Sequence, residues 1–265
     1  MPLAHLGSIN LYYERAGDGP PLLFISGTGG DLRNKPNVFD GPLAKAFDVL
    51  AYDQRGLGRS DKPDVDYSMA DYADDAAALM DFAGWPGAGV IGVSFGGMVA
   101  QELALRHPAK VQRLVLACTS PGGAGGASYP FHEIQHLAGE ARARHLLPIS
   151  DTRRDAAWAA AHPETYAQLI AATSANPFAG EPGREMGARR QLEARANHDT
   201  WDRLDQIACP VMIAAGRYDG VALPATQERM AGRIAGATLR FFEGGHLFML
   251  QDRSATSAIA EFLKG

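Results

Sequence analysis

The chain has few cysteines, no excess of basic residues and no long hydrophobic run. Only two of its 265 residues are cysteines, Cys118 and Cys209, which is too few for the disulfide framework of a small secreted domain. We expect both thiols to be free. A formal net charge of −5 offers no basic field to phosphate groups, so neither nucleic acid nor anionic membrane is an expected partner. No apolar run approaches the ~20 residues that cross a bilayer.

The chain start shows no targeting signal. Residues 1–5 contain no positively charged segment followed by an apolar stretch, so we expect a cytoplasmic location. Hydrophobic residues make up 46% and charged residues 21% of the chain, which is typical of a globular protein. A chain of this length buries a large core without metal or disulfide. The composition does not reveal which oligomeric state the protein adopts.

Short apolar segments alternate with helical patterns along most of the chain. Residues 4–6 and 9–14 predict a β-hairpin, and further strands are predicted at 22–26, 48–53, 89–93, 113–118, 210–216 and 238–243. Helices are predicted at 67–83, 95–106, 223–234 and 253–263. This alternation is typical of a parallel sheet built from βαβ units, with helices on both faces.

The alternation stops after Cys118. Residues 121–126 read Pro-Gly-Gly-Ala-Gly-Gly, a composition that is incompatible with a strand. From there to about Asp199 the chain is rich in Ala, Arg and His at helical spacing and has no convincing strand. We therefore expect a sheet-containing core at 1–121 and 200–265, and a helical insertion at 122–199.

A serine follows one of the predicted strands in a sequence that favours a nucleophile. Gly92, Ser94 and Gly96 fit the pattern G-x-S-x-G, with a short apolar strand before it and a helix pattern after it. A sharp strand-to-helix turn strains the serine backbone, and glycines on either side avoid the collisions that side chains would cause. The hydroxyl of Ser94 is a weak nucleophile until a base removes its proton, so a histidine is expected nearby.

Suitable partners for Ser94 occur later in the chain. In enzymes with this turn the acid and then the histidine follow the serine in the sequence. Asp219 comes after the strand predicted at 210–216, and His246 comes after the strand predicted at 238–243, behind two glycines. Parallel strands place their carboxyl ends at one edge of the sheet, where open α/β sheets bind their ligands. We therefore predict a catalytic triad of Ser94, His246 and Asp219.

Acyl transfer also requires hydrogen-bond donors for the oxyanion. The backbone N–H of Phe95 lies directly after the predicted nucleophile, at the start of a helix. A second donor is expected in the glycine-rich loop 26–30, where we favour the N–H of Thr28. The alternative is that these glycines only form a tight loop.

Together these segments resemble the α/β-hydrolase superfamily, in its serine-dependent branch with a helical cap. The resemblance covers essentially the whole chain and rests on residues 53–60, 92–101, 216–219 and 245–246. It implies a mostly parallel eight-stranded sheet flanked by helices, with the cap inserted after the sixth strand. Similar proteins include 3-oxoadipate enol-lactonases, esterases, carbon-carbon bond hydrolases and cofactor-free haloperoxidase-like enzymes.

Departures from the family patterns reduce the number of reactions that this chain is expected to catalyse. Many relatives carry His-Gly in the oxyanion loop, whereas this chain has Ser26-Gly27. Relatives that open epoxides or remove halide use an aspartate nucleophile, and Ser94 argues against both reactions. Carbon-carbon hydrolases often place tryptophan after the catalytic histidine, and here Leu247 stands in that place.

Residues of the insertion and the loops are candidates for the substrate pocket. Gly27, Trp158, Phe178 and Leu247 are the predicted pocket residues, although aromatic residues at helical spacing more often belong to a core. Arginines of the insertion could pair with a substrate carboxylate. His132 and His136 stand four residues apart, but no further ligand set accompanies them, so no metal site is predicted.

These patterns predict a serine hydrolase that cleaves a small ester or lactone through an acyl-enzyme, without a cofactor. The activity is expected to be enol-lactonase-like or that of a carboxylesterase, with a small molecule held under the cap. Two alternatives remain open at this point. One is hydrolysis of a carbon-carbon bond in a vinylogous diketone, and the other is a catalytically silent binder of the same fold.

Overall fold

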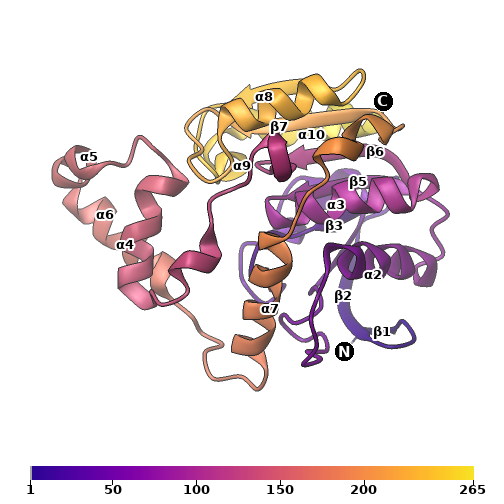
Figure 1. Cartoon of the computed structure of the whole chain (residues 1–265), viewed down its shortest axis with the longest axis horizontal. Helices are drawn as coiled ribbons and strands as arrows, with labels where there is room; N and C mark the ends of the chain where they lie inside the picture. Colours follow the sequence, from indigo (N-terminus) through magenta and orange to yellow (C-terminus); the bar gives the residue numbers. More distant parts are fainter. Residues whose placement is uncertain (1) are drawn as a thin grey trace.

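An eight-stranded mixed sheet forms the centre of the computed structural model, which describes residues 2–265 (Figure 1). The strand order is β1-β2-β4-β3-β5-β6-β7-β8. Strand β2 runs antiparallel to β1 and β4, and the remaining strands pair in parallel. The strands are β1 Leu3–His5, β2 Asn10–Ala16, β3 Pro21–Ile25, β4 Asp48–Tyr52, β5 Ala88–Val93, β6 Val111–Ala117, β7 Val211–Gly216 and β8 Thr238–Phe242.

Helices cover both faces of the sheet and fill the segment between β6 and β7. The α-helices are α1 Leu43–Ala46, α2 Met69–Phe82, α3 Phe95–Arg106, α4 Gly139–Ser150, α5 Ala156–Ala161, α6 Pro163–Ser174, α7 Arg184–Ala196, α8 Pro224–Arg233, α9 Phe248–Gln251 and α10 Arg253–Lys264. The predicted fold class is confirmed, and each predicted strand and helix ends within two residues of its observed bounds. Helices α1 and α9 were not predicted, because four residues are too few to show a helical period.

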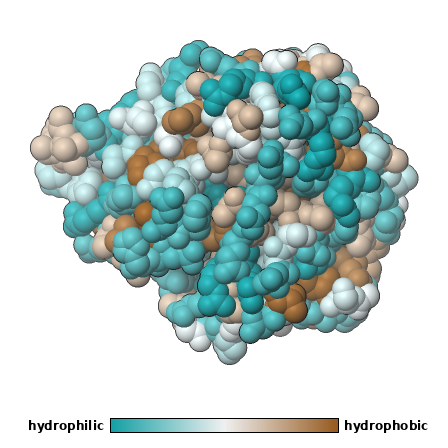
Figure 2. Space-filling model, in the orientation of Figure 1, coloured by the Kyte–Doolittle hydropathy of each residue, from teal (hydrophilic) through white to brown (hydrophobic). Residues whose placement is uncertain are grey.

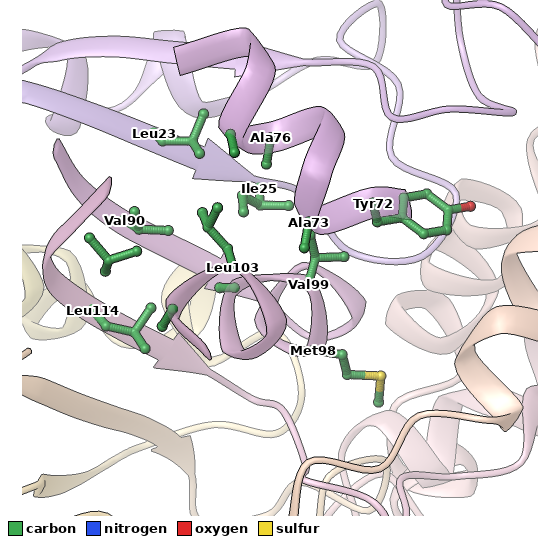
Figure 3. Packing of buried hydrophobic residues seen from close by; sticks show 14 of the residues in the cluster. Leu23, Ile25, Tyr72, Ala73, Ala76, Val90, Met98, Val99, Leu103 and Leu114 are labelled. Atoms are coloured by element: carbon green, nitrogen blue, oxygen red, sulfur yellow. The ribbon is translucent and has the colours of Figure 1, made fainter. Parts of the chain in front are cut away.

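Two hydrophobic layers enclose the sheet because successive strand side chains point to opposite faces. Leu114 and Leu116 of β6 join the layer beneath α2, α3 and α8, whereas Val115 and Ala117 join the layer beneath α1, α9 and α10. Figure 3 shows side chains of the first layer, with Val99 and Leu103 of α3 lying over the strands. Strands buried on both faces are apolar almost throughout, which is why the sequence revealed them.

Local sequence signals set the helix limits in the core. The side chain of Ser68 accepts a hydrogen bond from the N–H of Asp71, and the Asp71 carboxylate in turn accepts one from the N–H of Ser68. This capping box starts α2 at Met69. The helix α3 ends at Arg106, just before His107-Pro108, because the residue before a proline avoids helical backbone angles.

The segment after β6 is a helical insert. Figure 1 shows α4, α5 and α6 grouped at one side of the molecule, with α7 standing between them and the sheet. A small cluster of Ala143, Leu147 and Ile170 packs α4 against α6. The division into a core at 1–121 and 200–265 and an insertion at 122–199 remains a prediction.

The surface in Figure 2 is largely hydrophilic, and hydrophobic side chains occur there in small separate groups. Within residues 2–265, no helix combines the length and the apolar character that a membrane span requires.

Candidate active site

Ser94 occupies a tight turn between β5 and α3. Its backbone angles are φ 55° and ψ −114°, in a region that residues with a side chain seldom adopt. A Cβ on Gly92 would lie 2.3 Å from the carbonyl oxygen of Gly96, and one on Gly96 would lie 2.1 Å from that of Ile25. Only glycine fits at both positions, because α3 approaches the strands this closely. The turn therefore presents the serine at the carboxyl end of β5.

Two hydrogen-bond contacts connect Ser94, His246 and Asp219. The Nε2 atom of His246 lies 2.9 Å from Oγ of Ser94, and its Nδ1 atom lies 2.9 Å from Oδ2 of Asp219. The other carboxylate oxygen of Asp219 accepts hydrogen bonds from the N–H groups of Val221 and Ala222, at 2.8 and 2.9 Å. Asp219 is buried, so its orientation is held by protein groups alone. The structure thus brings all three predicted residues into one chain of contacts.

The loop that carries His246 is also held in place by the insert. The backbone N–H of His246 donates to the carbonyl oxygen of Ser150 at 2.6 Å, and the N–H of Gly220 donates to that of Ile149 at 3.0 Å. Both acceptors lie in the last turn of α4, where carbonyl groups have no partner within the helix. The insert is therefore joined directly to the two loops that carry His246 and Asp219.

Two backbone N–H groups next to Ser94 are free to donate. Within residues 2–265, the N–H groups of Phe95 and Thr28 have no protein acceptor. Phe95 is the first residue of α3, where the helix geometry leaves the N–H unpaired. A Cβ built on Gly27 would lie 3.5 Å from Cβ of Ser94, so the loop 26–30 passes close to the serine. These positions are suitable for an oxyanion, and that role remains a prediction.

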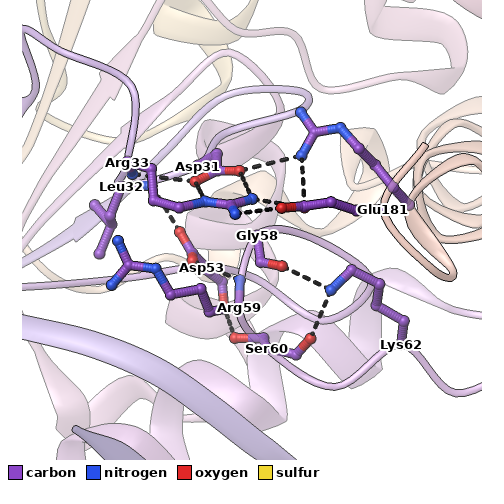
Figure 4. Close-up of polar contacts among 10 residues, drawn as sticks. Asp31, Leu32, Arg33, Asp53, Gly58, Arg59, Ser60, Lys62 and Glu181 are labelled. Atoms are coloured by element: carbon purple, nitrogen blue, oxygen red, sulfur yellow. Dashed lines mark hydrogen bonds and ion pairs between the residues drawn. The ribbon is translucent and has the colours of Figure 1, made fainter. Parts of the chain in front are cut away.

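Gln54 and Asp53 hold the loop 26–30 and the residue Leu32 after it in place. The amide of Gln54 donates to the carbonyl oxygen of Ser26 at 2.8 Å, and the carboxylate of Asp53 accepts the N–H of Leu32 at 2.7 Å. Burial raises the pKa of the Asp53 carboxyl to about 6, although the N–H groups of Arg59 and Leu32 oppose this shift. Figure 4 shows the Asp53 carboxylate between Leu32 and Arg59. The segment 53–60 thus helps to hold the backbone of loop 26–30 and of Leu32 in place.

An ion-pair cluster joins the same loop to the insert, as Figure 4 shows. The guanidinium group of Arg33 contacts Asp31 at 2.7 Å and Glu181 at 2.8 Å, and Arg184 of α7 contacts Asp31 at 3.1 Å. Burial alone would raise the pKa of Asp31, but hydrogen bonds from Arg33 and Arg184 outweigh it and hold the pKa at about 2. Sequence reasoning missed this cluster, because its members come from segments 150 residues apart.

A cleft of about 1220 Å³ lies between the glycine loop and the insert. Thr28 and Gly29 line it on the core side, next to the loop position of Gly27. The insert residues that line it carry a mixture of polar and apolar side chains, and they include Arg142, Leu146, Met186, Gln191 and Leu192. The sequence suggested Arg142 only as one of several insertion arginines that could meet a substrate carboxylate, and it did not indicate the other four. Which face of each insert helix meets the core depends on tertiary packing.

None of the four predicted pocket residues lines this cleft, and Gly27 adjoins it only through its neighbour Thr28. Trp158 stacks on His162 of the neighbouring turn, with ring centroids 4.9 Å apart. The ring of Phe178 lies under the Arg33 guanidinium at 3.6 Å, where it packs against the ion-pair cluster. Leu247 directly follows His246 and is 52% exposed. Their predicted contact with substrate remains a prediction.

Comparisons with known proteins agree with this architecture. The family model described as "alpha/beta hydrolase fold" matches residues 20–252. RutD of Variovorax paradoxus (strain S110), whose name proposes carbamate hydrolysis, is 33% identical over 89% of each chain. The 3-oxoadipate enol-lactonase 2 of Acinetobacter baylyi is 26% identical, over 92% of this chain and 88% of its own. The crystal structure of the enol-lactonase from Burkholderia xenovorans LB400 superposes with a TM-score of 0.80 at 26% identity, over 100% of both chains.

The matched segment contains β3 to β8, the turn that carries Ser94 and the loops that carry Asp219 and His246. The family match, the strand order and the turn geometry are therefore consistent with one another. This chain belongs to the α/β-hydrolase family.

Proposed function

We propose that this α/β-hydrolase is a serine enzyme that cleaves a small ester or lactone, with Ser94 as nucleophile, His246 as base and Asp219 as the orienting acid. The observation that carries the proposal is the pair of 2.9 Å contacts from the imidazole of His246 to Ser94 Oγ and to Asp219 Oδ2. A hydroxyl is activated by such an arrangement, since the base can accept its proton while the acid holds the required tautomer.

The reaction proceeds in two steps. In the first, Ser94 Oγ attacks the carbonyl carbon and its proton moves to Nε2 of His246, which then passes that proton to the leaving alkoxide. The N–H groups of Phe95 and Thr28 stabilise the oxyanion, a contribution of about 3 to 4 kcal/mol for each donor. In the second step, water loses a proton to the same imidazole and attacks the acyl-enzyme. The carboxylic acid leaves and Ser94 regains its proton.

The substrate class follows from the relatives and from the cleft. Two of the relatives are named enol-lactonases, which act on a cyclic ester. We propose that residues 122–199 act as a cap over the core at 1–121 and 200–265, and that the cleft beside Thr28 admits the substrate. A cap of this kind excludes water and shapes the space around the acyl group. An enol-lactonase-like or carboxylesterase activity fits these features.

A fluorophosphonate probe tests the nucleophile, because such probes react with serines activated by a base. We expect one label per wild-type chain, located on Ser94 by peptide mass spectrometry, and no label on Ser94→Ala. The matched control is Ser257→Ala, which removes an exposed serine on α10 and should label as wild type does. Folded wild-type protein that stays unlabelled would contradict the proposal and favour a catalytically silent binder.

A substrate panel then tests the bond type. We expect turnover of p-nitrophenyl esters and of small lactones, followed by mass spectrometry of the products. Turnover of ring-fission diketones without turnover of esters would replace the proposal with carbon-carbon bond hydrolysis. Turnover of carbamates alone would retain Ser94 chemistry but change the substrate class.

A further inference from the structure

A buried arginine lies next to the candidate site without an acidic partner. Arg195 of α7 is 6% exposed, and within residues 2–265 it forms no ion pair. Its guanidinium donates to Oγ1 of Thr28 at 2.8 Å and to Oγ of Ser128 at 2.7 Å, and it lies 4.3 Å from the ring centroid of Phe131. The two hydroxyl groups and the aromatic ring carry no negative charge, so they do not neutralise the guanidinium group. A buried cation of this kind is costly unless an anion accompanies it.

Two other arginines, both more exposed than Arg195, do meet carboxylates. Arg184, on the same helix, pairs with Asp31, and Arg203 pairs with Glu102. Burial lowers the pKa of Arg195 to about 10, so the group still carries its proton at neutral pH. The cation is therefore present. The buried carboxylate of Asp219 acts on it through space, but within residues 2–265 no carboxylate contacts the guanidinium group directly.

The guanidinium group borders a small cavity of about 70 Å³ whose lining contains no acidic residue. Ser120 and His198 also line this cavity, and both are buried. The hydroxyl of Ser120 and both ring nitrogens of His198 have no hydrogen-bond partner in residues 2–265. Buried polar atoms are nearly always paired, so unpaired atoms from two residues at one cavity indicate a polar occupant. The volume suits a few water molecules or one carboxylate group.

The neutral form of His198 suits an anion that also accepts hydrogen bonds. Burial lowers the pKa of His198 to about 4, so at neutral pH one ring nitrogen carries a proton and can donate. Ser120 supplies a hydroxyl donor, and Arg195 supplies a planar fork that matches a carboxylate. The donors of all three side chains therefore complement one carboxylate.

The cavity is close to the proposed nucleophile. Met98, one helical turn after Ser94, is part of its lining. Arg195 also touches Thr28, whose N–H is one of the proposed oxyanion donors. Met98 and Thr28 therefore connect the cavity to the helix that follows the proposed nucleophile and to the loop of the proposed oxyanion donor.

We propose that Arg195, His198 and Ser120 form a carboxylate subsite, and that the substrate is an ester or lactone with a free carboxylate on its acyl part. This inference rests on the proposed function, because it assigns the substrate class of that same site. Arg195 acts as the charge that binds the carboxylate, and His198 and Ser120 donate the remaining hydrogen bonds. The other interpretation is that Arg195 only braces the loop that contains Thr28.

Two esters with the same leaving group separate these interpretations. Mono-p-nitrophenyl glutarate carries the carboxylate, and p-nitrophenyl valerate carries a methyl group in its place. The quantity measured is the ratio of their kcat/KM values after subtraction of the enzyme-free rate. We expect wild type to prefer the glutarate ester at least tenfold and Arg195→Met to lower this ratio at least tenfold, because a charged hydrogen bond is lost. The exposed Arg144→Met on α4 is the matched control and should keep the ratio.

Further variants keep the inference testable if Arg195→Met does not fold. Arg195→Lys retains the charge without the fork, and we expect a smaller decrease of the ratio. Ser120→Ala removes one donor, and we expect about a threefold decrease. A wild-type ratio of one or less, or equal losses on both esters in every variant, would overturn the subsite and leave Arg195 with a positioning role.

A binding measurement separates failure of the subsite from failure of the proposed function. Glutarate should raise the Tm of Ser94→Ala, and the shift should be absent when Arg195→Met is added. If Ser94 reacts with the fluorophosphonate but glutarate gives no shift, only the carboxylate subsite is wrong. If glutarate binds but neither ester is cleaved and Ser94 stays unlabelled, the serine hydrolase proposal is wrong.

Discussion

The carboxyl edge of the sheet and the helical insert are held together by different forces. At the sheet edge, Asp219 and the turn of Ser94 are buried and held by backbone groups and close glycine packing. The insert packs around a small cluster of its own and is joined to the core by backbone hydrogen bonds, such as those of His246 and Gly220, and by ion pairs, such as those of Asp31. Substitutions at the edge should therefore alter chemistry or folding, whereas loss of charge at the insert should alter its attachment.

The largest expected effect is a loss of activity at the carboxyl edge of the sheet. Asp219→Asn keeps the size of the side chain and one acceptor oxygen, but it no longer favours the required tautomer and charge of His246. We expect kcat for p-nitrophenyl acetate to fall about 10³- to 10⁴-fold, with little change of Tm. The control is Asp202→Asn, whose side chain is 89% exposed and which should behave as wild type. A loss below tenfold would show that Asp219 does not support the imidazole.

The second effect concerns packing at the same edge. In Gly96→Ala the new methyl group would lie 2.1 Å from the carbonyl oxygen of Ile25, so α3 must move away from β3. We expect the free energy of unfolding to fall by about 3 kcal/mol or more, measured by urea denaturation. Gly232→Ala in α8 meets open space and should raise stability slightly, through its helix propensity. Similar stabilities for the two variants would show that the turn tolerates a wider approach of the helix.

The smallest effect tests the attachment of the insert. Asp31→Asn removes the carboxylate that Arg33 and Arg184 share. Because part of this cluster is open to solvent, we expect the free energy of unfolding to fall by about 1 to 2 kcal/mol. Hydrogen exchange should rise first around residues 178–187 and remain unchanged in β5 and β6. Asp66→Asn, whose side chain is 94% exposed, is the control and should change neither measurement.

The pH dependence of that variant gives the sign of the Asp31 contribution. Its folded pKa of about 2 lies below the ordinary aspartate value of about 4, so its contribution is complete above pH 4 and is lost as the pH falls toward 2. The difference in unfolding free energy between wild type and Asp31→Asn should therefore shrink over this window. A difference that stays constant to pH 2 would contradict the assigned pKa.

Prediction from sequence succeeded where the information is local. Strands such as β5 and β6 are apolar almost throughout, and α2 starts at a capping box that is visible as Ser68 and Asp71. The pattern around Ser94, together with Asp219 and His246 after late strands, was sufficient to nominate three residues that the structure then brings together. Their catalytic roles remain predictions for the probe and the variants to test.

Prediction failed where information depends on how the insert packs. Periodicity in the insert shows that helices form, but it does not show which face meets the core, and the cleft-lining residues Met186 and Leu192 were not identified. Trp158 and Phe178 were predicted as aromatic pocket residues, and the structure places them against His162 and Arg33. The cavity beside Arg195 arises from segments around positions 98, 120, 128 and 195, which no local pattern connects.

The amino-acid sequence by itself determined the strand and helix alternation, the glycine-lined serine turn and the chain order of serine, acid and histidine, because these depend on neighbouring residues and on rules of sheet topology. Only the tertiary structure decided that Gln54 and Asp53 brace the loop beside Ser94, and that Arg195 is buried without an acidic partner. The physical reason is that burial and charge pairing are properties of the surroundings, which form only when distant segments pack together.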